Sequence, residues 1–381
     1  MNDYLQHYTM RLTALAPIHV GNGRLIEKKE YIRFEKEDAR YGIKQPVIIP
    51  DWNKMIRDLC FLRKENEFDS FMLSDDRRAS LADWLTSQHI EKSRVQKWAS
   101  YTLNSGDAFI KTNGGSAPPK EINCFCKDPY GMAYVPGSTL KGMMRTALLI
   151  HEIKRDTEKY RRLLNDLDES SLRKANKKSY LQKETQDLEN RAFHTLNRPD
   201  TKMQDAVNSV MSGLVVGDSK PIPTSQLMLC QKIDFSLDQL ENPLPTLREA
   251  LKPGTEVVFD LTIDSQIFPY NMEDILRALN EFQADCYEYF YKQFGRGKNA
   301  DGIVWLGGGV GFLSKTILYS LYGEDAFRIA DNVFRITLSE KIYNQHKHER
   351  DKRLKIAPHV CKCTKYQGRL YDMGMGKLEV V

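Results

Sequence analysis

The chain has 381 residues, a length that suits two domains or one large one. Its hydrophobic fraction of 41% and charged fraction of 28% are those of a globular protein that faces water. No apolar run is long enough for a transmembrane helix, and the first residues lack the basic and apolar regions of a secretory signal. We therefore expect a cytoplasmic protein that binds no membrane.

The seven cysteines are scattered, and their odd number favours a reducing compartment over a disulfide framework. Two pairs have the spacing Cys-x-Cys, namely Cys124 with Cys126 and Cys361 with Cys363. Zinc ligands usually stand further apart in the sequence. A metal site shared between the two pairs is therefore the weaker alternative to free thiols.

The net charge of +5 is concentrated near the C-terminus, where residues 341–381 carry ten Lys and Arg against four Asp and Glu. A basic terminal segment predicts contact with a polyanion. The alternative is a solvated tail that has no partner.

In chain order, residues 8–16 alternate between apolar and polar side chains and predict a half-buried strand. This strand ends in a glycine-rich turn at 17–23. An extended run at 46–50 leads to Asp51, which is expected to cap a helix. Residues 68–103 are expected to be helical.

An exposed loop is predicted at 111–120 and a short strand at 134–135. The following helix should begin with Ser138 or Thr139 as its N-cap. Residues 152–204 are dense in both charge signs and are expected to form exposed inserted helices or a partly mobile segment.

The second half of the chain shows the same mixture of elements. Extended segments are predicted at 212–219, 227–230, 255–263 and 333–337, and helices at 271–294 and near 313–322. We therefore predict an α+β fold of two modified ferredoxin-like, split βαβ domains with helical insertions. The expected domains are 1–211, with the charged insertion at about 152–204, and 212–381, with a glycine-rich loop and the basic tail.

The glycine-rich loop lies at 305–316 and contains Gly307, Gly308, Gly309 and Gly311, followed by Lys315. It is not a P-loop, because Ser314 stands between the last glycine and the lysine. A dinucleotide-binding motif would need glycine at Phe312 or Ser314. Two interpretations remain open, namely a loop that lies against a phosphate backbone and a tight turn between packed elements.

The predicted helix at 138–149 has two distinct faces. Its apolar stripe, expected to be core, consists of Leu140, Met143, Met144, Ala147 and Leu148. Another face carries Ser138, Lys141 and Arg145. Helix starts bind phosphate through unpaired amides, and cations add charge-assisted bonds. The alternative is an ordinary capped helix with two solvated cations.

Three segments, at 16–23, 135–147 and 306–316, occur in an order and spacing that resemble the RAMP superfamily of CRISPR-associated proteins. Within it the chain looks most like the fifth subunit of the type III-A (Csm) effector complex. The resemblance runs from about residue 12 to about residue 316, and it is poor in the charged insertion and in the basic tail.

The resemblance implies RRM-like folds, a guide RNA held through backbone contacts, and no nucleotide cofactor. The partners it implies are guide (CRISPR) RNA and neighbouring RAMP backbone subunits, with target RNA and maturation nucleases as further candidates. It also implies a role in antiviral defence, as a subunit that caps the guide near its 3′ end and is needed for assembly and for guide RNA maturation.

The RNA contacts that the resemblance implies are His19, Gly21, Gly23, Ser138, Lys141, Arg145, Gly307, Gly308, Gly309, Gly311 and Lys315. Arg296 and Lys298 join them because glycines flank them in a predicted loop. Phe312, Phe294 and Tyr130 are candidates for base stacking, with an ordinary place in the core as the alternative.

A ribonuclease without metal would need a general base, and His19 is the one histidine inside these motifs. A structural or phosphate-contacting role for His19 is the preferred interpretation. Asp107 is a speculative acidic site. We therefore predict a non-catalytic subunit, with a metal-independent RAMP endoribonuclease that processes repeat RNA, or an enzyme with a phosphate ligand, as the alternatives.

Overall fold

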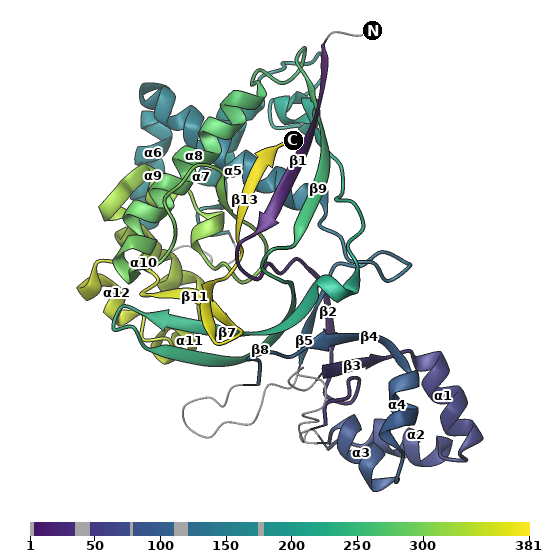
Figure 1. The fold of residues 1–381 in the computed structure, drawn as a ribbon. Coiled ribbons are helices and arrows are strands. Elements are labelled where there is room, and N and C mark those ends of the chain that lie inside the picture. The colour runs from purple at the N-terminus through teal and green to yellow at the C-terminus, as the bar shows by residue number, and fades with distance from the viewer. Residues whose placement is uncertain (1–3, 35–45, 77–78, 110–120, 174–178) are drawn as a thin grey trace.

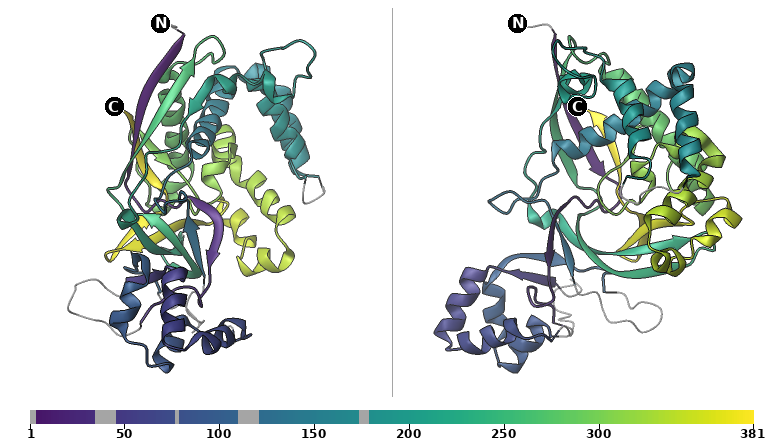
Figure 2. Two further views of the ribbon diagram at one scale, coloured as in Figure 1. Left: turned by 90° about the vertical axis from the view of Figure 1, so that its right-hand side faces the viewer. Right: turned by 180° about the vertical axis from the view of Figure 1, so that it is seen from behind.

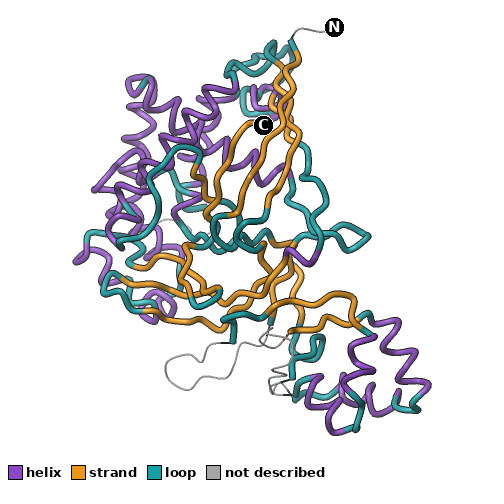
Figure 3. The backbone as a smooth tube through the Cα atoms, in the orientation of Figure 1, coloured by secondary structure: helices purple, strands orange, loops and turns teal. Residues whose placement is uncertain are grey.

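The computed structural model describes residues 4–34, 46–76, 79–109, 121–173 and 179–381. Two β-sheets lie one above the other in the view of Figure 1, with most of the helices gathered on one side of them. The tube in Figure 3 shows the strands of the two sheets as separate groups. This arrangement confirms the predicted α+β class.

The upper sheet, called sheet A, has five antiparallel strands. Their order is β10 (Ile303–Trp305), β13 (Met375–Val380), β1 (Leu5–Ala14), β9 (Glu256–Asp264) and β6 (Leu214–Val216). Helices α5 (Gly137–Arg155) and α8 (Met272–Tyr289) pack against each other and against this sheet. When the elements that belong to neither this sheet nor its two helices are left aside, the chain order β1, α5, β6, β9, α8 and β10 reads β-α-β-β-α-β, and β13 lies between β10 and β1 in the sheet.

The lower sheet, called sheet B, has eight strands. Its main path is β12 (Arg369–Asp372), β11 (Val360–Tyr366), β7 (Leu227–Ser236), β8 (Glu241–Leu251), β5 (Ile122–Phe125) and β2 (Gly21–Ile26). Strands from both sides of residue 211 meet in each sheet. The two-domain division at that residue and its ferredoxin-like detail stay predictions.

A lobe with its own core projects from sheet B, at the lower right of Figure 1. It consists of β3 (Pro46–Pro50), β4 (Ala99–Asn104), α1 (Trp52–Phe61), α2 (Glu65–Leu73), α3 (Leu81–Ser87) and α4 (Lys92–Lys97). Asp51 caps α1 as predicted, because its carboxylate accepts the Lys54 amide at 3.1 Å. The helical prediction for 68–103 is wrong at its end, where β4 pairs with β3.

The remaining helices form a layer beside the sheets (Figure 2). They are α6 (Thr157–Ser171), α7 (Gln182–Phe193), α9 (Leu318–Tyr322), α10 (Ala326–Thr337), α11 (Glu340–Gln345) and α12 (Glu349–Leu354). Short 3-10 turns are η2 (Ala206–Asn208), η3 (Val210–Gly213), η4 (Thr224–Gln226), η5 (Tyr291–Phe294), η6 (Leu313–Lys315) and η7 (Gly323–Asp325). The helices predicted within 152–204 are thus confirmed.

Several predicted elements are confirmed and two are wrong. The strands expected at 8–16, 46–50, 227–230 and 255–263 are β1, β3, β7 and β9, and the helix expected at 271–294 is α8 followed by η5. The strand predicted at 333–337 is the end of α10, because Ala326, Ile329 and Ala330 extend its apolar pattern with helical spacing. Residues 134–135 form no strand, and the predicted loop at 111–120 lies outside the described residues.

The basic segment 341–381 is folded, so the expectation of an appended tail is wrong. β11 joins sheet B, and β13 lies between β10 and β1 in sheet A. Part of its positive charge is neutralised within the fold, through the ion pairs Arg350–Asp238, Lys352–Asp331, Lys362–Asp234, Lys365–Glu241 and Lys377–Glu379. Across the described parts of the chain, every helix is too short or too polar to cross a membrane.

Candidate nucleic-acid interface

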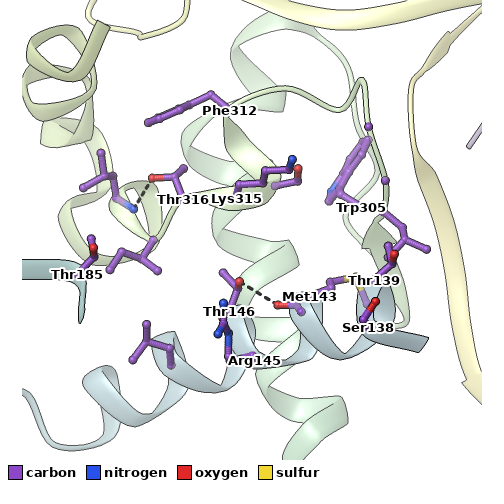
Figure 4. Close-up of a pocket in the computed structure, with 18 of the residues that line it drawn as sticks. Ser138, Thr139, Met143, Arg145, Thr146, Thr185, Trp305, Phe312, Lys315 and Thr316 are labelled. Atoms are coloured by element: carbon purple, nitrogen blue, oxygen red, sulfur yellow. Dashed lines mark hydrogen bonds between the residues drawn. The ribbon is translucent and has the colours of Figure 1, made fainter. Parts of the chain in front are cut away.

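The three glycine-containing segments meet at one groove of about 900 Å³. The predicted RNA contacts that line it are His19, Gly21, Gly23, Ser138, Arg145, Gly307, Gly308 and Lys315. Figure 4 shows Lys315 and Phe312 on the glycine-rich loop, facing Ser138, Thr139 and Arg145 on α5. The predicted contacts outside its lining are Lys141, Arg296, Lys298, Gly309 and Gly311.

The glycines of the loop satisfy a backbone requirement. Gly307, Gly309 and Gly311 have φ of 90°, 100° and 99°, which residues with side chains rarely adopt. A side chain at Gly307 would also meet the carbonyl oxygen of His19. The group that comes close to Gly307 is therefore the protein's own backbone. For this reason the glycines alone do not indicate a ligand.

His19 is buried in the groove wall, with 5% of its surface exposed. Its Nδ1 lies 2.6 Å from the carbonyl oxygen of Glu249, so Nδ1 carries the proton and donates it. Burial lowers the pKa of His19 to about 4, and the positive charges of Arg248 and Lys127 act in the same direction. The imidazole is thus neutral at pH 7, with Nε2 as an acceptor.

The start of α5 differs from the expectation. The N-cap position is Pro136, so Ser138 and Thr139 do not cap the helix. The amide of Gly137 donates to the Asp218 carboxylate at 2.8 Å, so the chain's own acid occupies part of the site where a phosphate was expected. Ser138 is exposed and lines the groove, where its hydroxyl is available to a ligand.

Three cations stand near the groove in different states. Arg145 lies 3.4 Å from the Glu189 carboxylate, and both side chains are partly exposed. Lys315 is exposed and forms no ion pair with any described residue. Lys141 is half-buried, and burial together with the charge of Arg145 lowers its pKa. Lys315 is therefore the cation that is most available to a ligand.

Arg296 and Lys298 lie away from the groove lining. Arg296 forms an ion pair with Asp372, and its guanidinium lies 5.3 Å from the centre of the Phe235 ring. This pairing gives Arg296 a structural role that its glycine neighbours in the sequence did not suggest. Lys298 is exposed.

Sequence reasoning missed the hydroxyl groups of the groove, which are those of Thr139, Thr146, Thr185, Ser314, Thr316 and Thr337. Thr185 and Glu189 come from α7, in the charged insertion, and Thr337 comes from α10. No local pattern could have found them, because their role depends on which helix faces are covered. Hydroxyls are neutral groups that can bond both phosphate and ribose oxygens.

Trp305 is a second feature that sequence reasoning missed. Trp305 lines the groove, stacks on Tyr291 with ring centres 4.1 Å apart, and carries a buried Nε1–H that finds no acceptor among the described residues. Of the predicted stacking candidates, half-buried Phe312 lines the groove, Phe294 is buried in the core, and Tyr130 is 92% exposed outside the lining. Phe312 is therefore the one predicted stacking candidate that lines the groove.

The two Cys-x-Cys pairs cannot share a metal. Cys124 lies on β5 and Cys126 directly follows it, whereas Cys361 and Cys363 lie on β11, with β7 and β8 between these strands. Three strand spacings separate them by about 14 Å. The described cysteines are free thiols, and burial raises the pKa of Cys124 to about 11.

Two other buried clusters have metal-ligand side chains. His348, Asp351 and His359 form one, in which the Asp351 carboxylate accepts Nδ1–H from both imidazoles, at 2.8 Å from His348. Cys361, Cys363 and Asp372 form the other, in which Asp372 is neutralised by Arg296. Both carboxylates already have partners within the protein, because Asp351 accepts hydrogen bonds from two histidines and Asp372 pairs with Arg296.

The groove therefore combines hydroxyls, two cations, one neutral imidazole and aromatic rings. Such groups bind phosphate and ribose oxygens and stack on a base of any identity. Base edges are read by amide and charged side chains that point in a fixed direction. In this groove such side chains are fewer than the hydroxyls. The chemistry of the groove suits a sugar–phosphate strand held without regard to sequence.

Comparison with known proteins finds relatives along most or all of the chain, two of which are described here. The CRISPR system Cms protein Csm5 of Mycobacterium tuberculosis (strain CDC 1551 / Oshkosh) is 29% identical over 402 residues, which cover 100% of this chain and 99% of that protein. Csm5 of Streptococcus thermophilus is 26% identical over 324 residues, covering 83% and 81%.

Several solved structures share the fold, and two of them follow. One belongs to the cryo-EM structure of the Csm-crRNA-target RNA ternary complex of a type III-A CRISPR-Cas system, with a TM-score of 0.63, 18% identity and coverage of 99% and 100%. The other is the crystal structure of T. onnurineus Csm5, with a TM-score of 0.58, 18% identity and coverage of 96% and 99%. The model of the RAMP superfamily matches residues 11–314. The chain belongs to the RAMP superfamily.

Proposed function

We propose that the chain is a non-catalytic subunit of a type III-A CRISPR effector complex and that its groove holds the sugar–phosphate backbone of guide RNA. It would cap the 3′ end side of the guide and be needed for assembly and for guide RNA maturation. Its partners would be guide RNA, neighbouring RAMP subunits, target RNA and maturation nucleases.

The observation that carries this proposal is the convergence of three segments on one groove. Residues 19–23, 138–146 and 305–318 are far apart in the sequence, yet they form adjoining walls. Csm5 relatives match along most or all of the chain, and one structural neighbour is part of a complex with crRNA and target RNA. An RNA ligand accounts for both findings.

The state of His19 supports a subunit that does not cut RNA. A general base works best with a pKa near the working pH, and the pKa of His19 is about 4. Its Nδ1 is also committed to the Glu249 carbonyl. Asp107, the speculative acidic site, accepts the Gly368 amide at 2.7 Å and thereby joins two chain segments.

The test is assembly of the complex from purified subunits and guide RNA. The double variant Arg145→Met/Lys315→Met should reduce the amount of guide that co-purifies and leave the isolated subunit folded. The matched control is Lys97→Met on α4, which removes an exposed cation from the lobe. Normal guide retention by the double variant would contradict the proposed groove, and cleavage of repeat RNA by the purified chain would contradict the non-catalytic role.

A further inference from the structure

Three cations lie on neighbouring strands of sheet B. They are Lys232 on β7, Arg248 on β8 and Lys362 on β11, and all three are half-buried. Arg248 is paired with Cys230 across β7 and β8, and Lys362 is paired with Asp234 across β7 and β11. Lys232 lies between these two positions of β7, so the three side chains form one group, called here the sheet B cation cluster.

The sheet B cation cluster contains fewer acidic partners than cations. Lys362 bonds the Asp234 carboxylate at 2.7 Å, whereas Lys232 and Arg248 form no ion pair with the described residues. Nη1 of Arg248 is buried and has no acceptor there. Burial, and then the charges of Lys362 and Arg248, lower the pKa of Lys232 to about 8. Unpaired cations below the surface are unfavourable, which is a reason to look for an anionic ligand.

The glycine-rich loop crosses directly beside the cluster. A Cβ built on Gly309 would lie 3.2 Å from Nη1 of Arg248, and one built on Gly311 would lie 2.9 Å from Cγ of Lys362. The backbone amides of Gly309, Val310 and Gly311 have no acceptor in the described parts of the chain. Free neighbouring amides of this kind can bind an anion, and cations beside them strengthen that binding.

The cluster also adjoins the groove. The charge of Arg248 acts on His19 in the groove wall. Phe312 lines both the groove and a second cavity of about 520 Å³, to which Lys362 and His346 also belong. An RNA strand that leaves the groove past Phe312 would therefore next meet Lys362, the member of the cluster that lines the second cavity.

We propose that Lys232, Arg248 and Lys362 form a second phosphate-binding site, which takes a phosphodiester group of the RNA strand beyond the groove. The proposal rests on the proposed function, because it takes RNA as the ligand of the groove. RNA is favoured over an acidic protein surface because Lys362 lines a cavity that shares Phe312, a ring able to stack on a base, with the groove.

The experiment measures the binding of the full chain to a labelled single-stranded RNA of mixed sequence at several salt concentrations. Each lost phosphate contact should reduce the slope of log K against log salt by about 0.7. We expect Lys232→Met/Arg248→Met to reduce this slope by about 1.4 units. Lys97→Met, in the lobe, should leave it unchanged.

A second readout separates a ligand site from a structural one. Lys232→Met removes a half-buried charge that forms no ion pair with the described residues, so the RNA-free variant should have a higher Tm while it binds RNA more weakly. A lower Tm with unchanged RNA affinity would show that Lys232 serves the fold alone, and it would overturn the proposal.

The groove variant Arg145→Met/Lys315→Met distinguishes the possible failures. If it weakens RNA binding and the cluster variant does not, the second site is wrong and the proposed function stands. If wild type binds no RNA alone or in the assembled complex, both are wrong. If the cluster variant keeps RNA binding and loses a neighbouring subunit, the ligand is an acidic protein surface and the phosphate site is overturned.

Discussion

Gly308 donates its backbone N–H to the carbonyl oxygen of His19 at 2.7 Å. This bond joins the glycine-rich loop to the turn before β2, although 289 positions of sequence number separate the two residues. Two of the three segments that resemble the RAMP superfamily are thus fixed to each other by the backbone. The groove depends on this connection, because both segments line it.

Replacing the neighbouring glycine should loosen the connection. In Gly307→Ala the methyl group would meet the His19 carbonyl, and φ of 90° is unfavourable for alanine. We expect the free energy of unfolding to fall by about 1–3 kcal/mol, measured by urea denaturation. The control is Gly142→Ala in α5, where a Cβ meets nothing within 4 Å and where alanine should add about 0.5–1 kcal/mol. Equal stability of both variants would contradict the strain at Gly307.

The cations around the groove should differ in their effect on RNA binding. Arg145→Met and Lys315→Met should each reduce the salt-dependence slope by about 0.7, because both residues line the groove. Lys141→Met is the matched comparison on the same helix as Arg145, since Lys141 is half-buried outside the lining. A smaller change for Lys141→Met is expected, and an equal change would place Lys141 among the phosphate contacts.

Lys232 gives a prediction about pH. Its pKa is about 8 in the folded chain and 10.5 in the unfolded chain, so between these values the unfolded chain holds the additional proton. The free energy of unfolding therefore rises with pH between 8 and 10.5. Below pH 8, the full destabilisation caused by the charge of Lys232 is present. The groups that act on Lys232 are Lys362, Arg248 and Asp234.

Lys232→Met should accordingly be more stable than wild type, by roughly 1–3 kcal/mol at pH 7. The gain should shrink as the pH approaches 10.5, when wild-type Lys232 becomes neutral in both states. Urea denaturation at several pH values measures this difference. A gain that does not vary with pH would show that its origin is packing and not charge.

Glu249 joins the lobe to sheet B. Its side chain is fully buried, accepts Tyr101 Oη–H at 2.5 Å and the Phe125 amide at 2.7 Å, and pairs with Lys127. Glu249→Ala should lower the free energy of unfolding by about 3–5 kcal/mol, because one buried and two half-buried donors lose their acceptor. Thermal unfolding is the measurement. Lys220→Met, which breaks an exposed ion pair with Asp260, should change stability by less than about 1 kcal/mol.

His19 predicts sensitivity to acid. Its pKa is about 4 in the fold and 6.5 in the unfolded chain, so the unfolded chain takes up the proton first as the pH falls. The protein should lose stability between pH 6.5 and pH 4 for this reason. His19→Asn keeps a donor near the Glu249 carbonyl and should flatten this loss, whereas the exposed control His89→Asn should not. Parallel pH profiles of all three proteins would contradict the burial of a neutral His19.

Much of the local structure could be predicted from the sequence. Alternation located β1 and β9, and the apolar stripe of α5 is buried at Leu140, Met143 and Met144. These predictions succeed because strand and helix periods are properties of neighbouring residues. They fail where the window is short, as at 333–337, since five residues with three apolar positions fit a strand or a helix end.

The candidate site was predicted in part. The segments that line the groove were identified, whereas the hydroxyls of Thr185 and Thr337 were not. Arg296 illustrates the reverse case, because the glycines around it indicate an open loop while the fold supplies Asp372 as its partner. Whether a polar residue serves a ligand or the fold depends on partners that are distant in the sequence.

The sequence by itself determined the α+β class, the periodic elements and the three motif segments, because these follow from residue type and local spacing. Only the tertiary structure decided that the basic segment 341–381 supplies strands to both sheets, that Asp218 occupies the start of α5, and that Lys232 and Arg248 lie together beside the glycine-rich loop. The physical reason is that strand pairing and burial join residues across the whole chain, and no local pattern encodes which strand a segment will pair with.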